Sequence, residues 1–327
     1  LIAIGASPIP TAIKSILPSY SAASPIEMED EAAAISRLIK RVTSSLSLTY
    51  NPEVQKYIDR YVKQGRRSTS CLLARASYYN PFFEEALRHY GLPMELKHLP
   101  VIESGLNPKA ISGKGAAGLW QFMPTTGRQY DLQINTFVDE RLDPIKSSYA
   151  AARMLADLYN RFGDWSLALA AYNCGPGRVS NAIEKAGEAA DFWQIYEFLP
   201  KETRGYVPAF IAANYVMNYY AEYNILPEPT SLPEKAGKVV VTEDISLAKV
   251  ADVLNMDIAD LRMLNPQYRQ GIVKTIDGTA TLLLPSEKVK CFTDNVSRLY
   301  ENSENSESQR LEMAARIVKG TMHNPHS

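Results

Sequence analysis

The stretch LPVIESG, residues 99–105, places a lone carboxylate, Glu103, at the end of an apolar run and just before small, turn-forming residues. Pro93 suits the first turn of a helix that leads to this point, and the apolar residues before the acid recur at helical spacing, namely Leu92, Leu96, Leu99 and Ile102. We therefore expect Glu103 at the inner end of a largely buried helix, where desolvation raises the pKa of a carboxyl group. A carboxylic acid that stays protonated near neutral pH can act as a general acid. The alternative is a helix-end Glu that is exposed or paired with Lys109 or Lys114.

Three later segments add neutral polar and aromatic groups. A glycine-dense loop, residues 112–118, runs into an aromatic and amide cluster, and glycine lets a backbone approach a ligand closely. An apolar helix then ends in a tyrosine and an asparagine, and a second tyrosine begins a later helix. Neutral donors and acceptors match the hydroxyl and acetamide groups of sugars, and aromatic faces cover pyranose rings. The candidate residues are Trp120, Gln121, Tyr172, Asn173 and Tyr206.

Each of these side chains also has a purely structural interpretation. Tyr172 could be a core tyrosine with a satisfied hydroxyl, and Asn173 could be the C-cap of its helix. Gln121 could cap or bridge backbone groups. Trp120 suits a sugar subsite and a core anchor equally well.

The order of these motifs resembles the lytic transglycosylases of bacterial cell walls. It runs from Glu103-Ser104 through GLWQ, residues 118–121, to AYN, residues 171–173. The stretches DFW, residues 191–193, and ETRGYV, residues 202–207, are similar to the membrane-bound lytic murein transglycosylase D branch of that family. Each motif is weak alone, but four of them in the right order over residues 92–220 are highly specific.

The resemblance implies that Glu103 is the catalytic acid/base and that Tyr206 orients it. It also implies that further residues line the sugar subsites: Ser104, Trp120, Gln121, Tyr172 and Asn173. Trp120 replaces the Met of many relatives, and Cys174 stands where Ser is often found. Neither change touches the acid, so both bear on subsite fit more than on activity.

The motifs supply one carboxylate, whereas most glycosidases use two. Four further acids follow downstream but resemble loop and cap residues, namely Asp131, Asp139, Glu140 and Asp143. A single acid implies that the N-acetyl group of muramic acid stabilises C1, and that ring closure by the C6 hydroxyl leaves a 1,6-anhydroMurNAc end without consuming water. The alternatives are a lysozyme-type muramidase that hydrolyses the same MurNAc–GlcNAc β-1,4 bond, and a non-catalytic peptidoglycan-binding protein.

The composition is that of a globular chain longer than one typical domain, with 327 residues, 46% hydrophobic and 22% charged. A net charge of -1 without a basic stripe makes nucleic acid a poor partner, so peptidoglycan glycan strands remain the expected one. The three cysteines and four histidines lack metal-ligand spacing, and we expect no metal and no cofactor. No apolar run approaches the roughly 18–20 residues of a membrane span. Because the chain begins at Leu1, an export signal or membrane anchor would lie upstream, and the resemblance implies the periplasm or cell envelope.

Helical patterns dominate residues 27–225, which predicts a mainly α, lysozyme-like domain. Asn51-Pro52, Asp143-Pro144 and Asp164-Trp165 are typical capped helix starts, and Asn80-Pro81 predicts another. A short β-like segment in the loop of residues 113–118 is the one expected exception.

A second, smaller domain follows a linker. Residues 226–237 are proline-rich, which stops helix and sheet. Residues 238–289 then read as strand, helix, helix and strand, a βααβ order that resembles a LysM module for N-acetylglucosamine chains. Its usual Gly-Asp-Thr reads Glu243-Asp244-Ile245 here, so a spacer is the alternative role. Residues 1–26 are expected to be a flexible arm, and residues 290–327 a tail without an assigned role.

Overall fold

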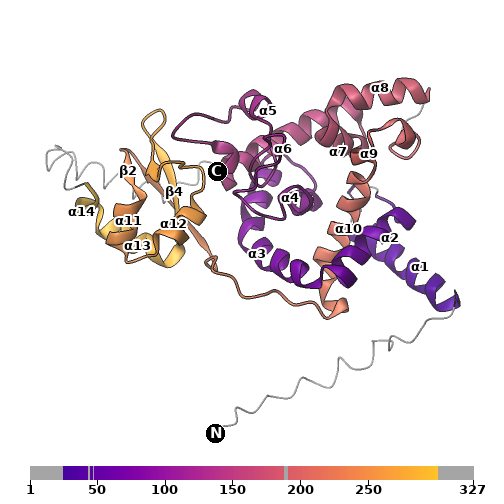
Figure 1. The fold of residues 1–327 in the computed structure, drawn as a ribbon, viewed down its shortest axis with the longest axis horizontal. Coiled ribbons are helices and arrows are strands. Elements are labelled where there is room, and N and C mark those ends of the chain that lie inside the picture. The colour runs from indigo at the N-terminus through magenta and orange to yellow at the C-terminus, as the bar shows by residue number, and fades with distance from the viewer. Residues whose placement is uncertain (1–24, 43–44, 47, 188–190, 301–327) are drawn as a thin grey trace, which may run out of the picture.

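The computed structural model describes residues 25–42, 45–46, 48–187 and 191–300, and shows a helical domain followed by a small α/β domain (Figure 1). The predicted arm and tail therefore lie mostly outside the described residues. The helical domain contains α1 (Pro25–Val42), α2 (Pro52–Asp59), α3 (Arg66–His89), α4 (Leu99–Ser104), α5 (Pro124–Gln129), α6 (Pro144–Phe162), α7 (Trp165–Cys174), α8 (Pro176–Ala186), α9 (Lys201–Arg204) and α10 (Tyr206–Tyr219). Shorter turns are the π-helical η2 (Arg60–Gln64) and the 3-10 helices η3 (Met94–His98), η4 (Glu140–Leu142), η5 (Tyr196–Phe198) and η6 (Tyr220–Tyr223).

The helical domain is built around α10. Most of this helix is buried from Tyr206 to Val216, and α1, α2, α4, α7 and α9 pack against it. A helix that is apolar on every face is stable only inside a core. This position carries Tyr206, its first residue, into the interior of the domain.

The three capped helix starts predicted at Asn51, Asp143 and Asp164 are confirmed. Each side chain accepts a hydrogen bond from a backbone N–H of the first turn, at 3.0 Å for Asn51 and 2.8 Å for Asp143 and Asp164. These bonds satisfy donors that the helix itself leaves unpaired. Local sequence was sufficient at these three ends.

The helix start predicted at Asn80-Pro81 is wrong, because Pro81 lies inside the continuous helix α3. Proline in a helix removes one backbone hydrogen bond and usually kinks it. Here two pairs of buried aromatic side chains flank the proline and bind both halves of the helix to the core, namely Tyr78 with Tyr79 and Phe82 with Phe83. Tertiary packing therefore outweighs the local signal.

The second domain has the predicted βααβ order, with an added pair of short strands. It contains β1 (Ala236–Val241), β2 (Ile245–Ser246), α11 (Leu247–Leu254), α12 (Ile258–Leu264), β3 (Ile272–Val273), β4 (Ala280–Pro285), η7 (Ser286–Lys288), α13 (Val289–Asp294) and α14 (Val296–Tyr300). Antiparallel β1 and β4 pair from Ala236↔Pro285 to Val241↔Ala280, and β2 pairs with β3.

The boundaries of this domain differ from the predicted 238–289. Strand β1 begins two residues earlier, and α13 and α14 occupy the start of the predicted tail. Phe292, Val296 and Leu299 on these helices are buried in the core of the domain. The sequence prediction missed these helices because each is only five or six residues long and a polar stretch follows directly after residue 300.

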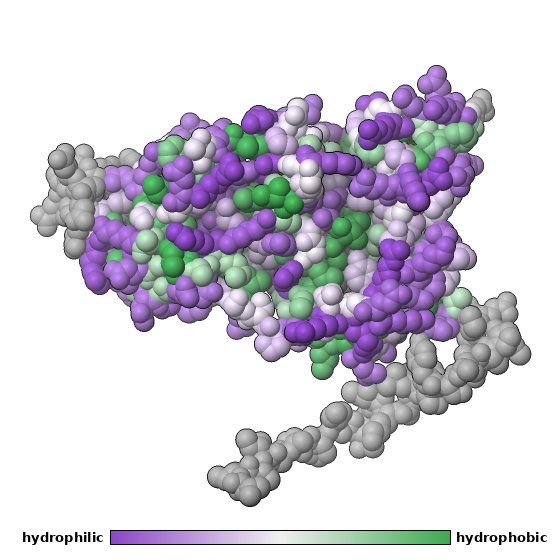
Figure 2. All heavy atoms as spheres, viewed as in Figure 1, coloured by the Kyte–Doolittle hydropathy of each residue, from purple (hydrophilic) through white to green (hydrophobic). Residues whose placement is uncertain are grey.

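The linker and the second domain both contact the helical domain. In Figure 1 the linker after α10 runs below α3 to β1. The backbone N–H of Glu228 in this linker donates to the carbonyl oxygen of Ser70 on α3 at 3.2 Å. Lys238 of β1 forms an ion pair of 2.9 Å with Glu85 of α3. Figure 2 shows hydrophobic residues in the middle of this face, framed by hydrophilic ones.

Candidate active site

Glu103 lies on the short helix α4, one residue before its end. Leu99, Pro100 and Val101 anchor the helix in the core. Gly105 has a φ of 59°, the left-handed conformation that commonly ends a helix and that glycine adopts without strain. The chain therefore turns away just after Glu103, as predicted, although the turn before α4 is the 3-10 helix η3.

Tyr206 donates a hydrogen bond from its hydroxyl to Oε1 of Glu103, so the predicted contact is present. The two residues are far apart in sequence and meet because α10 packs against α4. Burial raises the pKa of Tyr206 well above its ordinary value, and the negative charge of Glu103 raises it further. Tyr206 is therefore a neutral donor at any physiological pH.

Burial raises the pKa of Glu103 from 4.5 to about 7. The hydrogen bond from Tyr206 opposes this rise, whereas the negative charge of Glu202 adds to it. Protein atoms surround most of the carboxyl group, yet part of the residue remains exposed. A protonated acid with an accessible edge can transfer its proton to a ligand.

Ser104 connects the end of α4 to the glycine-rich loop. Its hydroxyl lies 2.9 Å from the carbonyl oxygen of Leu119 and 3.1 Å from that of Pro100. Because both contacts are to backbone carbonyls, Ser104 positions the loop beside Glu103. Its predicted contact with a sugar remains a prediction.

The glycine-rich loop, defined here as residues 110–122, has the predicted β-like character. Isolated antiparallel bridges join Ala117 to Ile111 and to Phe122. Gly118 has a φ of 84°, and a Cβ there would lie 1.8 Å from the carbonyl oxygen of Arg141. Only glycine fits at this position, where the loop meets the segment before α6.

Gln121 bridges backbone groups, which was the structural alternative for this residue. Its φ is 50°, and its amide nitrogen donates to the carbonyls of Gly118 at 2.8 Å and Ala110 at 3.2 Å. The side chain is partly exposed. These bonds use the amide nitrogen, so the amide oxygen is the group available to a ligand.

Tyr172 and Asn173 lie near the C-terminal end of α7. The Tyr172 hydroxyl donates to the carbonyl of Trp120 at 2.8 Å. Asn173 accepts a hydrogen bond of 2.8 Å from the Thr203 hydroxyl on α9. Gly175 rather than Asn173 is the C-cap of the helix, so the capping interpretation of Asn173 is wrong. Both side chains remain partly exposed.

The prediction that Trp120 contacts substrate is wrong. Its side chain is 1% exposed, its ring nitrogen donates to the Ser148 hydroxyl at 2.9 Å, and Phe83 packs edge-to-face against it. Every side of the indole is covered by protein, so Trp120 is a core anchor. The residues next to Trp120 carry no local signal that separates these two roles.

The four downstream acids have structural partners. The side chains of Asp131 and Asp139 pair with arginines, Glu140 pairs with a lysine, and Asp143 caps α6. The carboxylate that acts on Glu103 is instead Glu202, whose side chain is 74% exposed and lies 3.5 Å from Lys114. Sequence reasoning did not single out Glu202, although it stands in the quoted ETRGYV stretch.

Other unpredicted residues border this region. Ile111 lies in the glycine-rich loop and Met123 directly follows it; their side chains are 70% and 42% exposed, so this segment presents apolar surface. Thr203, which fixes Asn173, also belongs to the ETRGYV stretch. The sequence prediction considered only the tyrosine of this stretch and therefore missed the contacts of Glu202 and Thr203.

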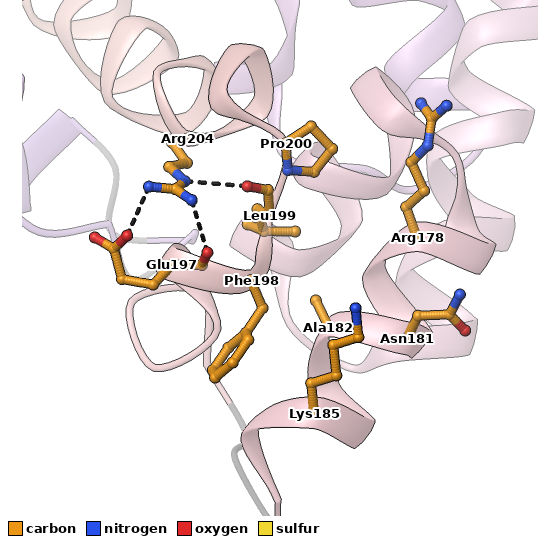
Figure 3. Close-up of a pocket in the computed structure, with 9 residues that line it drawn as sticks. All are labelled: Arg178, Asn181, Ala182, Lys185, Glu197, Phe198, Leu199, Pro200 and Arg204. Atoms are coloured by element: carbon orange, nitrogen blue, oxygen red, sulfur yellow. Dashed lines mark hydrogen bonds and ion pairs between the residues drawn. The ribbon is translucent and has the colours of Figure 1, made fainter.

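A cavity of about 400 Å³ opens elsewhere, between α8, η5 and α9 (Figure 3). Arg178, Lys185 and Arg204 line it, and Arg204 is held by the Glu197 side chain. No predicted site residue lines this cavity. We therefore place the candidate site at Glu103, whose chemistry suits a general acid, and not at this cavity.

The loop of the second domain that departs from the LysM pattern is occupied by contacts of its own. Asp244 accepts hydrogen bonds of 2.9 Å from both the backbone N–H and the hydroxyl of Thr275, and it pairs with Lys274. These bonds join the loop between β1 and β2 to the loop after β3. A sugar would have to compete with them there.

This fold and site define a chain with two recognisable domains. Residues 80–195 match the family described as transglycosylase SLT domain, and residues 235–301 match the family described as lytic transglycosylase MltD, LysM-like domain. The chain therefore carries an SLT domain followed by an MltD-type LysM-like domain. The predicted fold class, a lysozyme-like α-helical domain followed by a small βααβ domain, is confirmed.

Among particular proteins, the chain is 37% identical over 195 residues to membrane-bound lytic murein transglycosylase D of Escherichia coli strain K12. That match covers 58% of this chain and 43% of the relative, so the chain spans less than half of the relative's length. Soluble lytic murein transglycosylase of the same organism is 33% identical over 36% of this chain and 19% of its own length.

Two solved structures are also similar in sequence. The soluble lytic transglycosylase of Escherichia coli is 29% identical, with a TM-score of 0.38 over 45% of this chain and 25% of that chain. A lytic transglycosylase of Pseudomonas aeruginosa is 27% identical, with a TM-score of 0.37 over 46% and 25%.

Proposed function

We propose that this chain is a peptidoglycan lytic transglycosylase in which Glu103 is the single general acid/base. It would cleave the MurNAc–GlcNAc β-1,4 bond without water and leave 1,6-anhydroMurNAc ends. The observation that carries the proposal is the buried Glu103 carboxyl, whose pKa is raised to about 7 and which Tyr206 holds in place. The relatives named above add support for the substrate class.

The proposed reaction begins with Glu103 in its protonated form. Tyr206 donates to Oε1, which leaves Oε2 to carry the proton. That proton passes to the glycosidic oxygen as the C1–O bond breaks, and the MurNAc N-acetyl oxygen stabilises C1. The Glu103 carboxylate then takes the proton of the C6 hydroxyl, whose oxygen bonds to C1. The acid is regenerated, and the closure is favoured because it is intramolecular.

Subsite roles for the remaining predicted residues are part of the proposal. Gln121 lies in the glycine-rich loop, whereas Tyr172 and Asn173 lie on α7 and contact that loop and α9, respectively. Each of the three residues remains partly exposed. The exposed Ile111 and Met123 would cover the apolar face of a sugar ring. Ser104 would act by holding the loop next to the acid.

A lysozyme-type muramidase is the second candidate, and Glu202 is the observation that favours it. Its charge acts on Glu103, so a second carboxylate lies within electrostatic reach of the acid. A hydrolase needs such a group to activate water. Against it, the Glu202 side chain is mostly exposed and lies near Lys114.

Mass spectrometry of digested glycan strands, run in heavy-oxygen water, separates the two reactions. We expect new ends that are anhydro sugars without label. Labelled reducing ends, one water heavier, would establish hydrolysis instead. Glycan that binds but stays intact under conditions where a lysozyme cuts it would favour a non-catalytic binding protein.

We also propose that the chain works in the cell envelope, in the periplasm, on peptidoglycan strands. The name of the Escherichia coli relative supports a membrane-associated location. Among the described residues, no helix has the length and apolar character needed to cross a bilayer. Fractionation of cells that express the complete protein tests the location, and recovery in the cytoplasm would contradict it.

Glycan binding by the LysM-like domain is a separate proposal. Because Asp244 is engaged by Thr275 and Lys274, we expect the LysM-like domain to bind glycan modestly, with a Kd on the order of millimolar to high micromolar. The glycan site of the helical domain would strengthen binding of the whole chain by avidity. Pull-down of the full chain with Asp244→Ala on purified cell walls tests this. If retention at low salt equals that of the unaltered chain, the loop does not bind glycan.

A further inference from the structure

The two domains are joined by backbone pairing as well as by the linker. Val138 of the helical domain forms an antiparallel bridge with Tyr268 of the LysM-like domain. The N–H of Asp139 donates to the Gln267 carbonyl at 3.0 Å, and the N–H of Arg269 donates to the Phe137 carbonyl at 2.9 Å. A domain that only needed a tether would not require this pairing.

Side chains bury the seam between the domains. Val138 is 2% exposed and packs in the core of the LysM-like domain. Conversely, Leu264 and Leu283 of the LysM-like domain pack in the core of the helical domain. The Gln267 amide donates to the Asp143 carboxylate at 3.2 Å. The two domains therefore share apolar core at the seam.

The segment that pairs with the LysM-like domain also carries a buried ion pair. The Asp139 carboxylate accepts from Nε of Arg141 at 2.9 Å and from Nη2 at 2.8 Å. Nη1 of Arg141 donates to the carbonyls of Gly115 at 2.8 Å and Phe122 at 3.1 Å. Both charged side chains are less than one tenth exposed. Arg141 thus connects the segment that pairs with the LysM-like domain, residues 137–139, to both arms of the glycine-rich loop.

We propose that Arg141 is a positioning residue for the glycine-rich loop, and that the LysM-like domain holds this loop in place through Asp139 and Arg141. The loop carries Gln121, and its Leu119 carbonyl accepts a hydrogen bond from the hydroxyl of Ser104, the residue after Glu103. The catalytic consequence rests on the proposed function, whereas the structural consequence does not. The domain then contributes to turnover on short soluble glycans as well as to any binding of cell walls.

Arginine suits this position because its guanidinium is planar and always charged. It forms a two-point contact with a carboxylate while its remaining donors reach both carbonyls. Lysine would keep the charge and one contact with Asp139 but could not reproduce this fork. The loss of hydrogen bonds to a charged group should increase opening of the loop by roughly ten- to a hundredfold.

Amide hydrogen exchange of the full chain tests the proposal directly. The reporters are the N–H groups of Ala117, Gly118 and Phe122, whose hydrogen bonds close the loop. We expect Arg141→Lys to accelerate their exchange by roughly ten- to a hundredfold while α2 exchanges as before. Arg153→Lys is the matched control, because its ion pair with Asp131 is exposed.

A variant on the seam tests the role of the LysM-like domain. Val138→Thr places a hydroxyl in its core, and Val138→Ala serves if that variant fails to fold. We expect faster exchange of the same loop amides although neither substitution touches the loop. Unchanged loop exchange in Arg141→Lys, or in both Val138 variants, would overturn the proposal.

Kinetics on soluble glycans supply the second measurement. In Arg141→Lys, kcat should fall at least as much as KM rises, and the pH dependence should stay unshifted because α4 and α10 keep Glu103 and Tyr206 in place. A shifted pH dependence would mean that Arg141 acts on the acid and not on the loop. If the loop opens as expected while the unaltered chain cleaves no glycan, the proposed function fails and the positioning role stands.

Discussion

Glu103→Gln should abolish the pH dependence that this residue gives to stability, in addition to removing the acid. The pKa of Glu103 is higher in the folded chain than its ordinary value of 4.5, so the folded state binds the proton more tightly. The stabilisation from that proton is complete below pH 4.5 and is lost as the pH rises through about 7. Glutamine carries no titrating proton and still accepts from Tyr206 through its amide oxygen.

The size of the effect follows from the pKa. A rise from 4.5 to about 7, at about 1.4 kcal/mol for each pKa unit, corresponds to at most about 3.5 kcal/mol. Glu103 as a residue remains partly exposed, so solvent screening reduces this figure. The measured quantity is the free energy of unfolding of the Gln variant minus that of the unaltered chain. This difference should be larger at alkaline pH than at acid pH, by up to that amount.

Urea unfolding at about pH 4 and about pH 8 measures both differences in the free energy of unfolding. Glu184→Gln, the same substitution at an exposed residue on α8, is the matched control. Turnover of the Glu103 variant should fall by roughly 100- to 10,000-fold at unchanged glycan binding. An equal stability difference at the two pH values would refute the burial argument, and near-normal turnover would refute the assignment of the acid.

Three other substitutions give distinct outcomes. Tyr206→Phe removes the hydrogen bond that lowers the pKa of Glu103. Turnover should therefore fall and the alkaline limb of the pH–rate profile should move to higher pH, with little change in the free energy of unfolding. Unaltered turnover would contradict the orienting role. Glu202→Gln removes a negative charge that raises the same pKa, so that limb should move downward, and an unmoved limb would exclude the electrostatic contact. Trp120→Phe breaks the bond to Ser148 and should lower the free energy of unfolding by about 1–3 kcal/mol while KM stays constant; a raised KM at unchanged stability would restore the subsite role.

The parts of the fold that depend on local contacts were predictable from sequence. Asn51, Asp143 and Asp164 cap helices through bonds to residues two or three positions away, and this is what a short motif encodes. The continuity of α3 through Pro81 was not predictable, because it depends on aromatic packing against distant helices. The same holds for α14, whose burial requires the assembled core of the LysM-like domain.

The candidate site divides in a similar way. The order of motifs was enough to predict that Tyr206 contacts Glu103, and the structure contains that hydrogen bond. Trp120 was misassigned because exposure is decided by what packs over the ring, here Phe83 and the helix that carries Ser148. Arg141 gave no signal, since its partners in the glycine-rich loop are backbone carbonyls, which every residue type supplies equally.

The seam between the domains has a consequence for the order of biosynthesis. Gln267 and Asp143, which bond across it, are 124 residues apart, and chains are made and begin to fold from the N-terminus. The helical domain therefore leaves the ribosome well before residues 267–269, which pair with its residues 137–139, have been synthesised. A nascent chain, or one clipped by a protease in the linker, would carry Glu103 but lack the partner of Val138. We expect such fragments to cut poorly, which would delay full lytic activity until the whole chain has been synthesised and assembled.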